Sequence, residues 1–191
     1  MNVYHRWLCQ SASWKAGLQQ LLPWALEGVD LGDHVLEIGP GPGLTTDLLR
    51  TRVSQMTALE IDPRLADSLK QRMANTNVYV MRGNATDMPF EDQQFSAVVA
   101  FTMLHHVPSV ALQNQLIAES YRVLKPGGVF AGVDSLSNLR FRLIHLGETM
   151  VAVNPDTLGT RLEAAGFTHS CVDKTARRFR FQALRTVEQE I

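Results

Sequence analysis

The residues that most clearly suggest chemistry form the run GPGPG at positions 39–43. An apolar, β-favouring segment from Val35 to Ile38 precedes this run, and leucines at helical spacing follow it from Leu44. Glycine permits positive φ and lets a ligand come close to the backbone, while proline stiffens the turn. A turn that opens a helix also presents free N–H groups, so it favours a ligand that carries negative charge.

The spacing of these glycines excludes two common nucleotide motifs. The dinucleotide fingerprint needs its third glycine at the position of Leu44, and the phosphate loop needs a Gly-Lys-Ser/Thr sequence that does not follow here. A tight surface turn is the alternative interpretation of clustered glycines. We favour a ligand-binding loop, because a strand precedes the turn and the next strand ends in an acidic residue, Glu60.

Apolar strands alternate with amphipathic helices along the chain. Strands are expected at 35–38, 53–61, 77–82, 95–101 and 129–134, and helices from 44 and at 64–73, 112–124 and 155–165. Two last strands, 168–174 and 178–185, predict a hairpin. The expected fold class is therefore α/β: a Rossmann-like, doubly wound, mostly parallel sheet with a C-terminal antiparallel hairpin and helices on both faces.

The composition is that of one globular domain over residues 1–191, with 45% hydrophobic and 19% charged residues and a net charge of −1. This charge gives no general attraction to nucleic acid or to a membrane surface. The two cysteines lack metal-like spacing, no secretion signal is evident, and no apolar run approaches the ~20 residues of a membrane helix. We expect a cytoplasmic protein without a membrane span and without a metal centre.

Two segments outside the alternating pattern are candidates for covering a ligand. Residues 1–30 are expected to form an N-terminal helical cap, in which a leucine-spaced helix is limited by Pro23. This cap either packs on the sheet edge or covers the cleft. Residues 136–153 are apolar with scattered polar side chains and are expected to act as a lid.

Polar signals fall where successive strands end, which is where open parallel sheets bind ligands. The glycine run follows the first strand, and Glu60 ends the second, where a carboxylate can accept the hydroxyl protons of a ribose. Asn84 and Ala85 follow the third strand, and Phe101 and Thr102 follow the fourth. Four such signals in order along one chain are more specific than any of them alone.

The stretch VLEIGPGPG resembles the first motif of class I S-adenosylmethionine-dependent methyltransferases, and the resemblance covers about residues 30–135. The stretches GNATDMPF, FTMLHH and ESYRVLKPGG are similar to the subgroup that contains the ubiquinone and menaquinone biosynthesis methyltransferases. The resemblance implies S-adenosyl-L-methionine as cofactor. It implies cofactor contacts from Glu37, Gly39, Pro40, Gly41, Gly43, Glu60, Ile61, Asn84, Ala85, Phe101 and Thr102. Many members of the subgroup have Asp at position 84, and Asn can replace it as an acceptor.

A second resemblance concerns the front half alone. LEIGPGPGLTTDLL and ALEIDPRLADSL look like the rRNA adenine dimethylases. Those enzymes follow strand four with Asn-Leu-Pro-Tyr or a close variant, whose amide and ring hold the target base. This chain has Phe101-Thr102-Met103-Leu104 there and lacks the basic charge of an RNA-binding protein. The similarity is therefore interpreted as shared cofactor architecture.

Methyl transfer from a sulfonium needs an acceptor held in line in a dry pocket, and a base only if the acceptor carries a proton. The candidates for that base are His106 and, more weakly, His5. The candidate substrate pocket consists of Tyr4, Trp7, His105, His145 and Met150. A packed or hydrogen-bonded histidine is the alternative interpretation at each of these histidines.

The expected function is methyl transfer to a small, partly apolar molecule by in-line displacement. The alternatives are an rRNA adenine N6-methyltransferase and a non-catalytic S-adenosylmethionine-binding partner protein. We expect no nucleic-acid partner, and a homodimer remains open as a way to complete the pocket.

Overall fold

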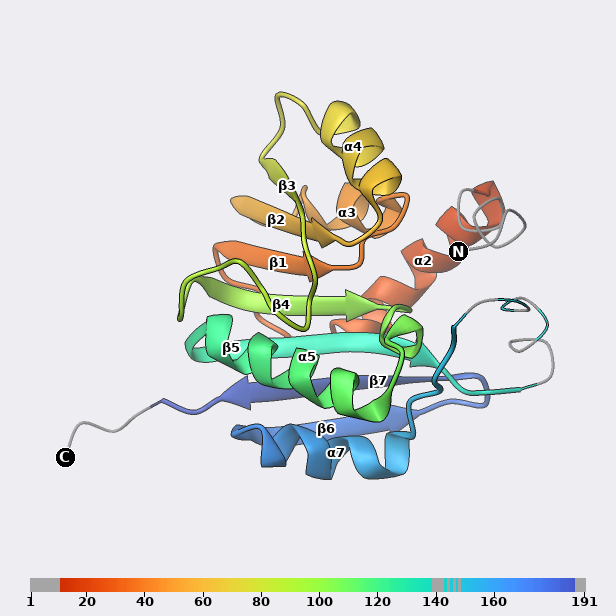
Figure 1. Cartoon of the computed structure of the whole chain (residues 1–191), viewed down its shortest axis with the longest axis vertical. Coiled ribbons are helices and arrows are strands. Elements are labelled where there is room, and N and C mark those ends of the chain that lie inside the picture. Colours follow the sequence, from red (N-terminus) through yellow and green to blue (C-terminus); the bar gives the residue numbers. More distant parts are fainter. Residues whose placement is uncertain (1–10, 139–142, 144, 146, 148, 188–191) are drawn as a thin grey trace.

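The computed structural model describes residues 11–138, 143, 145, 147 and 149–187. Within them, the chain forms a seven-stranded sheet in the order β3-β2-β1-β4-β5-β7-β6 (Figure 1). The strands are β1 His34–Ile38, β2 Gln55–Glu60, β3 Val78–Arg82, β4 Phe95–Phe101, β5 Leu124–Ser135, β6 Phe167–Lys174 and β7 Arg178–Arg185. The helices are α2 Ala12–Ala25, α3 Leu44–Leu49, α4 Pro63–Arg72, the 3-10 turn η1 Leu104–His106, α5 Val110–Val123 and α7 Pro155–Ala164.

Strands β1 to β5 run parallel to one another, whereas β7 pairs antiparallel with both β5 and β6. The expected doubly wound sheet with a C-terminal antiparallel hairpin is confirmed. The strand order reverses between β1 and β4, because the chain moves outward to β3 before it returns beside β1. Ligands of open α/β sheets bind at such a reversal, beyond the carboxyl ends of the strands.

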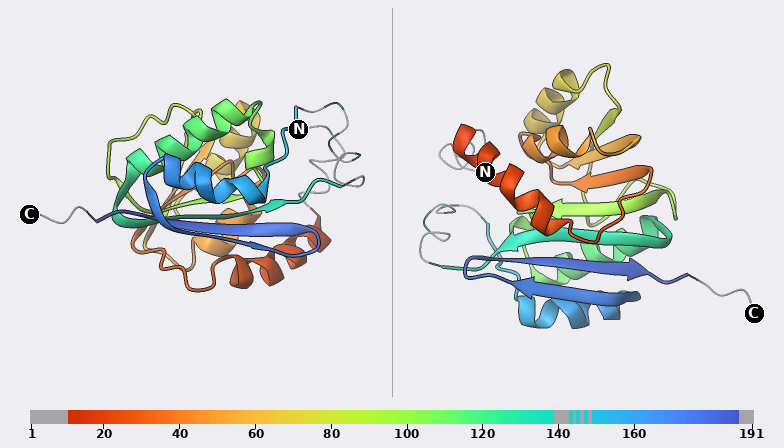
Figure 2. Two further views of the ribbon diagram at one scale, coloured as in Figure 1. Left: turned by 90° about the horizontal axis from the view of Figure 1, so that it is seen from below. Right: turned by 180° about the vertical axis from the view of Figure 1, so that it is seen from behind.

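Helices cover both faces of the sheet (Figure 2). On one face, leucines of α2 and α4 join Val35, Val99 and other strand residues in one buried cluster. On the other face, residues of α5 and α7 pack against Phe130, Phe179 and Phe181 in a second cluster. The sheet is therefore buried on both sides, as parallel sheets require. This packing fixes the positions of the strand ends.

The predicted end of the N-terminal helix was wrong. Pro23 was expected to limit the N-terminal helix, but α2 continues through it to Ala25. Proline lacks one N–H donor and strains the preceding turn, a cost that packing can outweigh near a helix end. Leu22 and Ala25, on either side of the proline, are buried in the core. Their burial explains why the helix completes another turn.

The connection from α5 to β5 also differs from the expectation. The predicted helix 112–124 begins earlier, at Val110, because the Ser109 hydroxyl caps it by accepting the N–H of Leu112 at 3.1 Å. Strand β5 begins directly at Leu124 instead of 129, and its pairing with β4 shifts register between Phe95 and Ala97. Residues 125–128, with the sequence Lys-Pro-Gly-Gly, thus form an irregular first part of the strand.

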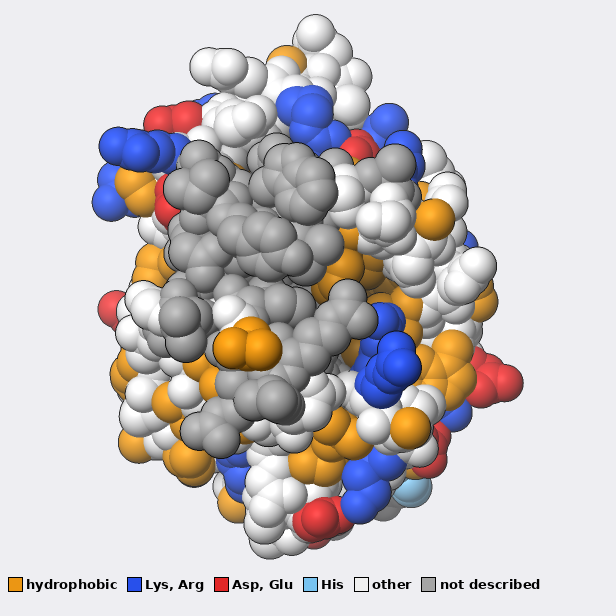
Figure 3. All heavy atoms as spheres, turned by 90° about the vertical axis from the view of Figure 1, so that its right-hand side faces the viewer, with side chains coloured by type: hydrophobic (Ala, Val, Ile, Leu, Met, Phe, Trp, Pro, Cys, Tyr) orange, Lys and Arg blue, Asp and Glu red, His pale blue; other side chains and the backbone are white. Residues whose placement is uncertain are grey.

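Strands β1, β4 and β5 point their carboxyl ends toward the same side of the molecule (Figure 1). Figure 3 views the molecule from that side, where described hydrophobic and basic side chains lie at the surface. Among the described residues, none of the helices has the length and apolar character that crossing a membrane would need. The candidate site is assembled at this edge.

Candidate functional site

The loop at residues 39–43 joins β1 to α3 and has the backbone shape that its glycines permit. Gly39, Gly41 and Gly43 have φ values of 62°, 55° and 80°, which other residues adopt rarely. The Gly39 N–H donates to the carbonyl of Leu59 at 2.9 Å, which holds the loop against β2. A Cβ added at Gly41 would meet no atom within 4 Å. The loop therefore forms an open cradle at Gly41, as a ligand-binding loop requires.

Glu60 lies beside this loop. One of its carboxylate oxygens accepts the N–H of Gly41 and the other accepts the N–H of Asp62, both at 2.9 Å. Its side chain is nearly buried, with 5% exposed. Burial raises the pKa of Glu60 above its usual range, against the lowering effect of the two N–H donors. The structure thus brings together the two strongest signals of the sequence, the glycine loop and the acidic strand end.

Glu37 is buried at the end of β1, with 1% exposed, and faces α3. Its oxygens accept hydrogen bonds from the hydroxyls of Thr45 and of Thr46, the latter at 2.5 Å. Burial raises the pKa of Glu37 to about 7, although both hydroxyls act in the opposite direction. The carboxyl group therefore anchors the first turn of α3 below the loop. Its predicted contact with the cofactor stays a prediction.

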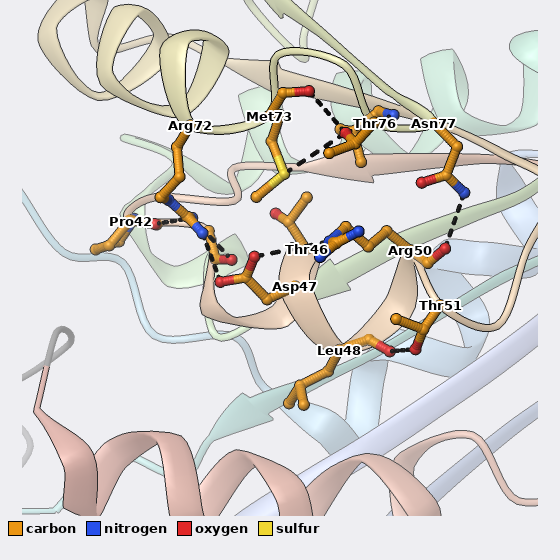
Figure 4. A network of polar contacts seen from close by, with 12 residues as sticks. Pro42, Thr46, Asp47, Leu48, Arg50, Thr51, Arg72, Met73, Thr76 and Asn77 are labelled. Atoms are coloured by element: carbon orange, nitrogen blue, oxygen red, sulfur yellow. Dashed lines mark hydrogen bonds and ion pairs between the residues drawn. The ribbon is translucent and has the colours of Figure 1, made fainter.

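Sequence reasoning missed Arg72, at the end of α4. Its guanidinium donates to the carbonyls of Pro42 and Gly43 at 2.7 and 3.2 Å and binds Asp47 of α3 at 2.5 Å. Figure 4 shows the arginine reaching across to the loop and to the carboxylate. No local pattern indicates this role, because the partners lie 25 to 30 residues away. Arg72 holds the back of the loop, and we call this contact the Arg72 clamp.

The other predicted cofactor residues lie at the same edge. Pro40 is a buried residue of the loop. Ile61 follows β2 directly and is 65% exposed. The Asn84 side chain accepts the N–H of Thr86 at 3.0 Å and so shapes the turn after β3. Ala85 packs half-buried against the core in that turn. The cofactor contacts that the resemblance implies for Ile61, Asn84 and Ala85 stay predictions.

Strand β4 ends in a wall of apolar residues. Phe101 is 5% exposed and belongs to the core. Thr102 has φ of 52°, and its N–H donates to the carbonyl of Val133 at 2.7 Å. Side-chain atoms of Met103 lie 3.1 Å from where a Cβ of Gly39 would stand. The methionine therefore borders the glycine loop directly.

Three predicted acceptor-side residues converge after β4. His105 and His145 are buried and His106 is half-buried. The Nε2 atoms of His105 and His145 are 3.1 Å apart, and Nδ1 of His105 lies 2.6 Å from a carboxylate oxygen of Asp134. Sequence reasoning did not identify Asp134, although it is the last residue of the predicted strand 129–134, and polar residues at strand ends were the signal that could have found it.

Met150 is half-buried, and the next residue, Val151, donates its N–H to the carbonyl of His105 at 2.8 Å. This bond brings the end of the predicted lid to the histidines. Tyr4, His5 and Trp7 lie outside the described residues. Their predicted roles stay predictions.

Comparisons with known proteins address the class. The Haemonchus contortus phosphoethanolamine N-methyltransferase 2, whose structure holds phosphomonomethylethanolamine and S-adenosylhomocysteine, superposes with a TM-score of 0.75. The two chains are 13% identical, and the match covers 96% of this chain and 56% of the other. The fold and the glycine loop beside an acidic strand end define a class I S-adenosylmethionine-dependent methyltransferase.

Residues 36–132 match the family model described as a methyltransferase domain, and the chain belongs to this family. Its cofactor is S-adenosyl-L-methionine, and the open cradle at Gly41 and the adjacent carboxylate of Glu60 fit that group.

Two sequence relatives are named for different activities. A demethylmenaquinone methyltransferase of Tropheryma whipplei (strain Twist) is 29% identical over 119 residues, which cover 62% of this chain and 46% of the relative. A Thermococcus onnurineus protein, "Probable ribosomal RNA small subunit methyltransferase A", is 40% identical over 105 residues, which cover 50% and 39%. The matches span less than half of each relative, so they do not decide the acceptor.

Proposed function

We propose that the chain transfers the methyl group of S-adenosylmethionine to a small, partly apolar acceptor by in-line displacement. The observation that carries this proposal is the hydrogen bond between the Gly41 N–H and Glu60, because it joins an open cradle to a buried carboxylate at neighbouring strand ends. The apolar end of β4 lies directly beside that cradle through Met103. One surface thus offers a cofactor side and an acceptor side.

The cofactor supplies a sulfonium methyl group with a good leaving group, so the protein has mainly to position and to exclude water. We assign the cradle at Gly41 to the amino-acid end of the cofactor and Glu60 to its ribose hydroxyls. The two oxygens of Glu60 would then accept hydrogen bonds from these hydroxyls in place of the backbone N–H groups. Glu37 and the Arg72 clamp keep the loop in shape from below. Met103 and Leu104 form a dry wall toward the acceptor.

The acceptor is proposed to have a sizeable hydrophobic body and few polar groups. Apolar pockets with a small number of polar side chains bind such ligands. Here the polar groups are the three histidines, which lie next to Leu104 and Met150. A quinone and its reduced form have this character, and the demethylmenaquinone methyltransferase relative is named for a quinone. Demethylmenaquinol is therefore the first acceptor to test.

The rRNA alternative has one observation against it. An adenine held for N6-methylation needs an aromatic ring to stack on and an amide to fix its amino group. Phe101, the aromatic residue at the end of β4, is buried in the core and does not present its face. The identity with the Thermococcus onnurineus protein is expected where the cofactor half is shared. We therefore favour the small acceptor.

Turnover separates an enzyme from a non-catalytic cofactor-binding partner. Purified protein is incubated with S-adenosylmethionine and a small-molecule extract, and S-adenosylhomocysteine is measured. We expect its formation to depend on the extract and to be lost in Gly41→Leu, because a side chain would fill the cradle. Cofactor binding without any turnover, across extracts and demethylmenaquinol, would favour the non-catalytic partner.

The remaining assignments are proposals of the same kind. We infer a single domain in which residues 1–30 and 136–153 cover the acceptor, and a homodimer would complete a pocket that these short segments leave open. The two cysteines without metal-like spacing suit a reducing compartment, so we propose a cytoplasmic location. Light scattering of the purified chain tests the dimer directly.

A further inference from the structure

The histidines His105, His106 and His145 form a cluster whose geometry goes beyond methyl transfer. Each offers one ring nitrogen, and these three atoms all lie within 4.8 Å of one another. The ring centroids of the three pairs are 4.2, 4.8 and 5.2 Å apart. The residues come from two segments 40 positions apart in the chain. We call this group the histidine cluster.

Asp134 fixes the tautomer of the His105 ring. The carboxylate is fully buried and accepts the N–H groups of His105 and Ser135, at 3.1 and 2.6 Å. It also lies 2.6 Å from Nδ1 of His105, so this nitrogen donates and Nε2 carries the lone pair. A carboxylate behind a histidine is the usual support of a metal ligand, because it fixes the tautomer and makes the ring more basic.

The spacing of the nitrogens fits a bound cation. Two imidazole nitrogens on one tetrahedral zinc ion are about 3.3 Å apart, given zinc–nitrogen bonds of about 2.0–2.1 Å. The Nε2 atoms of His105 and His145 are 3.1 Å apart in this structure. The ring of His106 is half-buried and would move toward the other two when the ion binds.

The backbone around the cluster is held in place. The N–H of Val151 donates to the carbonyl of His105 at 2.8 Å, and the amide of Gln113 donates to the carbonyls of Leu104 and Val151 at 3.2 and 2.9 Å. Gln113 is itself buried in α5. These bonds tie η1, α5 and the end of the 136–153 segment together, so the backbone of His105 is held in place before an ion arrives.

We propose that the histidine cluster binds one divalent first-row transition-metal ion, with zinc as the first to test. Imidazole nitrogen is a preferred ligand of such ions, and three protein ligands leave a fourth position open. That position lies at the acceptor side, where it could hold water or an oxygen of the acceptor. The inference stands independently of the acceptor's identity. It revises the expectation of no metal centre, which considered local spacing alone.

The test uses the full chain without an affinity tag, stripped with a chelator and titrated with Zn²⁺ at neutral pH in a calorimeter. We expect one Zn²⁺ per chain, and Co²⁺ should give the visible absorption of a tetrahedral nitrogen site. His106→Asn and His145→Asn should weaken binding at least about 100-fold, and Asp134→Asn roughly 10- to 100-fold. His169→Asn is the matched control, because it removes an exposed histidine at a φ of 50° that asparagine tolerates.

His106→Asn keeps the test valid if the buried variants do not fold, because this ring is half-buried. The proposal is overturned if the wild-type chain binds no Zn²⁺ beyond the His106→Asn level, or if all variants bind it equally. In that case the contact between His105 and His145 is a hydrogen bond in an Asp134–His105–His145 chain, and the cluster holds no ion.

Discussion

Glu60 connects two backbone segments at the residue scale, because its oxygens accept the N–H groups of Gly41 and Asp62. Its side chain is nearly buried, with 5% exposed. These donors offset part of the cost of its burial, and its pKa stays above its usual range. In the proposed complex the same oxygens meet the ribose. The residue therefore has both a structural and a binding role.

Glu60→Ala is expected to weaken S-adenosylhomocysteine binding roughly 10- to 150-fold, which corresponds to about 1.5–3 kcal/mol for hydrogen bonds to a charged group. Calorimetric titration measures the dissociation constant. Asp67→Ala is the control, since it removes a carboxylate from an exposed position of the neighbouring α4. An unchanged affinity in Glu60→Ala would assign the ribose contact to another residue.

Glu37 makes stability depend on pH. Its pKa is raised by burial from 4.5 to about 7, so the folded state binds more protons than the unfolded state between these values. The contribution of protonated Glu37 to folding stability is fully present below about pH 4.5 and is lost as pH rises through 7. The shift corresponds to about 3 kcal/mol at about 1.4 kcal/mol per pKa unit.

Glu37→Gln should remove that dependence, because glutamine does not titrate. Chemical denaturation of both proteins from pH 4.5 to 8 measures the difference in their free energies of unfolding. Between pH 4.5 and 8, we expect the free energy of unfolding of the variant to rise relative to that of the wild type by about 3 kcal/mol. Parallel curves for the two proteins would show that Glu37 does not titrate as its burial implies.

Sequence reasoning located residues correctly in space where the signal was local. The glycine run and Glu60 were placed together correctly, because strand ends of a parallel sheet meet at one edge. Asp134 was missed although it ends the predicted strand 129–134, because its role shows only through its contact with His105. Spatial convergence over 40 residues, as between His105 and His145, also leaves no mark in local spacing.

The Arg72 clamp belongs to the scale of elements, because it connects α4 to the loop before α3. Arg72→Met removes donors to two loop carbonyls and to Asp47. The arginine side chain is 40% exposed, so solvent screens the contact and we expect a loss of only about 1 kcal/mol. For a chain of this size that lowers the melting temperature by about 2–4 °C.

Thermal unfolding followed by circular dichroism tests the Arg72 clamp. Lys70→Met is the matched control, because it removes a cation from an exposed position of the same helix. Binding of S-adenosylhomocysteine should weaken in Arg72→Met and not in Lys70→Met. A melting temperature equal to that of the control would mean that the loop keeps its shape without the clamp.

Elements were predictable where hydrophobic period and capping agree, as in α7, where the Asn154 side chain accepts the N–H of Asp156 at 3.0 Å and Pro155 occupies the first turn. Boundaries were less predictable. Pro23 did not end α2, because buried neighbours outweighed the local cost of proline. Local preference therefore predicted the elements better than their ends.

At the scale of the whole molecule, the strand order explains why the site forms. The reversal between β1 and β4 places the glycine loop beside the apolar end of β4. The antiparallel β7 pairs along β5 from Val129 to Ser135 and so supports the strand that carries Asp134. The cofactor side and the acceptor side thus depend on pairing between strands that are distant in the chain. The alternation of strands and helices in the sequence predicted the class of fold in which this pairing occurs.

Tritium transfer from labelled S-adenosylmethionine tests the central claim most directly. Wild-type protein is incubated with a total extract to which demethylmenaquinol and ribosomal subunits are added, and the organic phase and the RNA are counted separately. Gly41→Leu provides the background. We predict label in the organic phase at a level well above that of the variant, and none in RNA. Label in ribosomal RNA above the Gly41→Leu background, with none in the organic phase, would contradict the proposal of a small apolar acceptor.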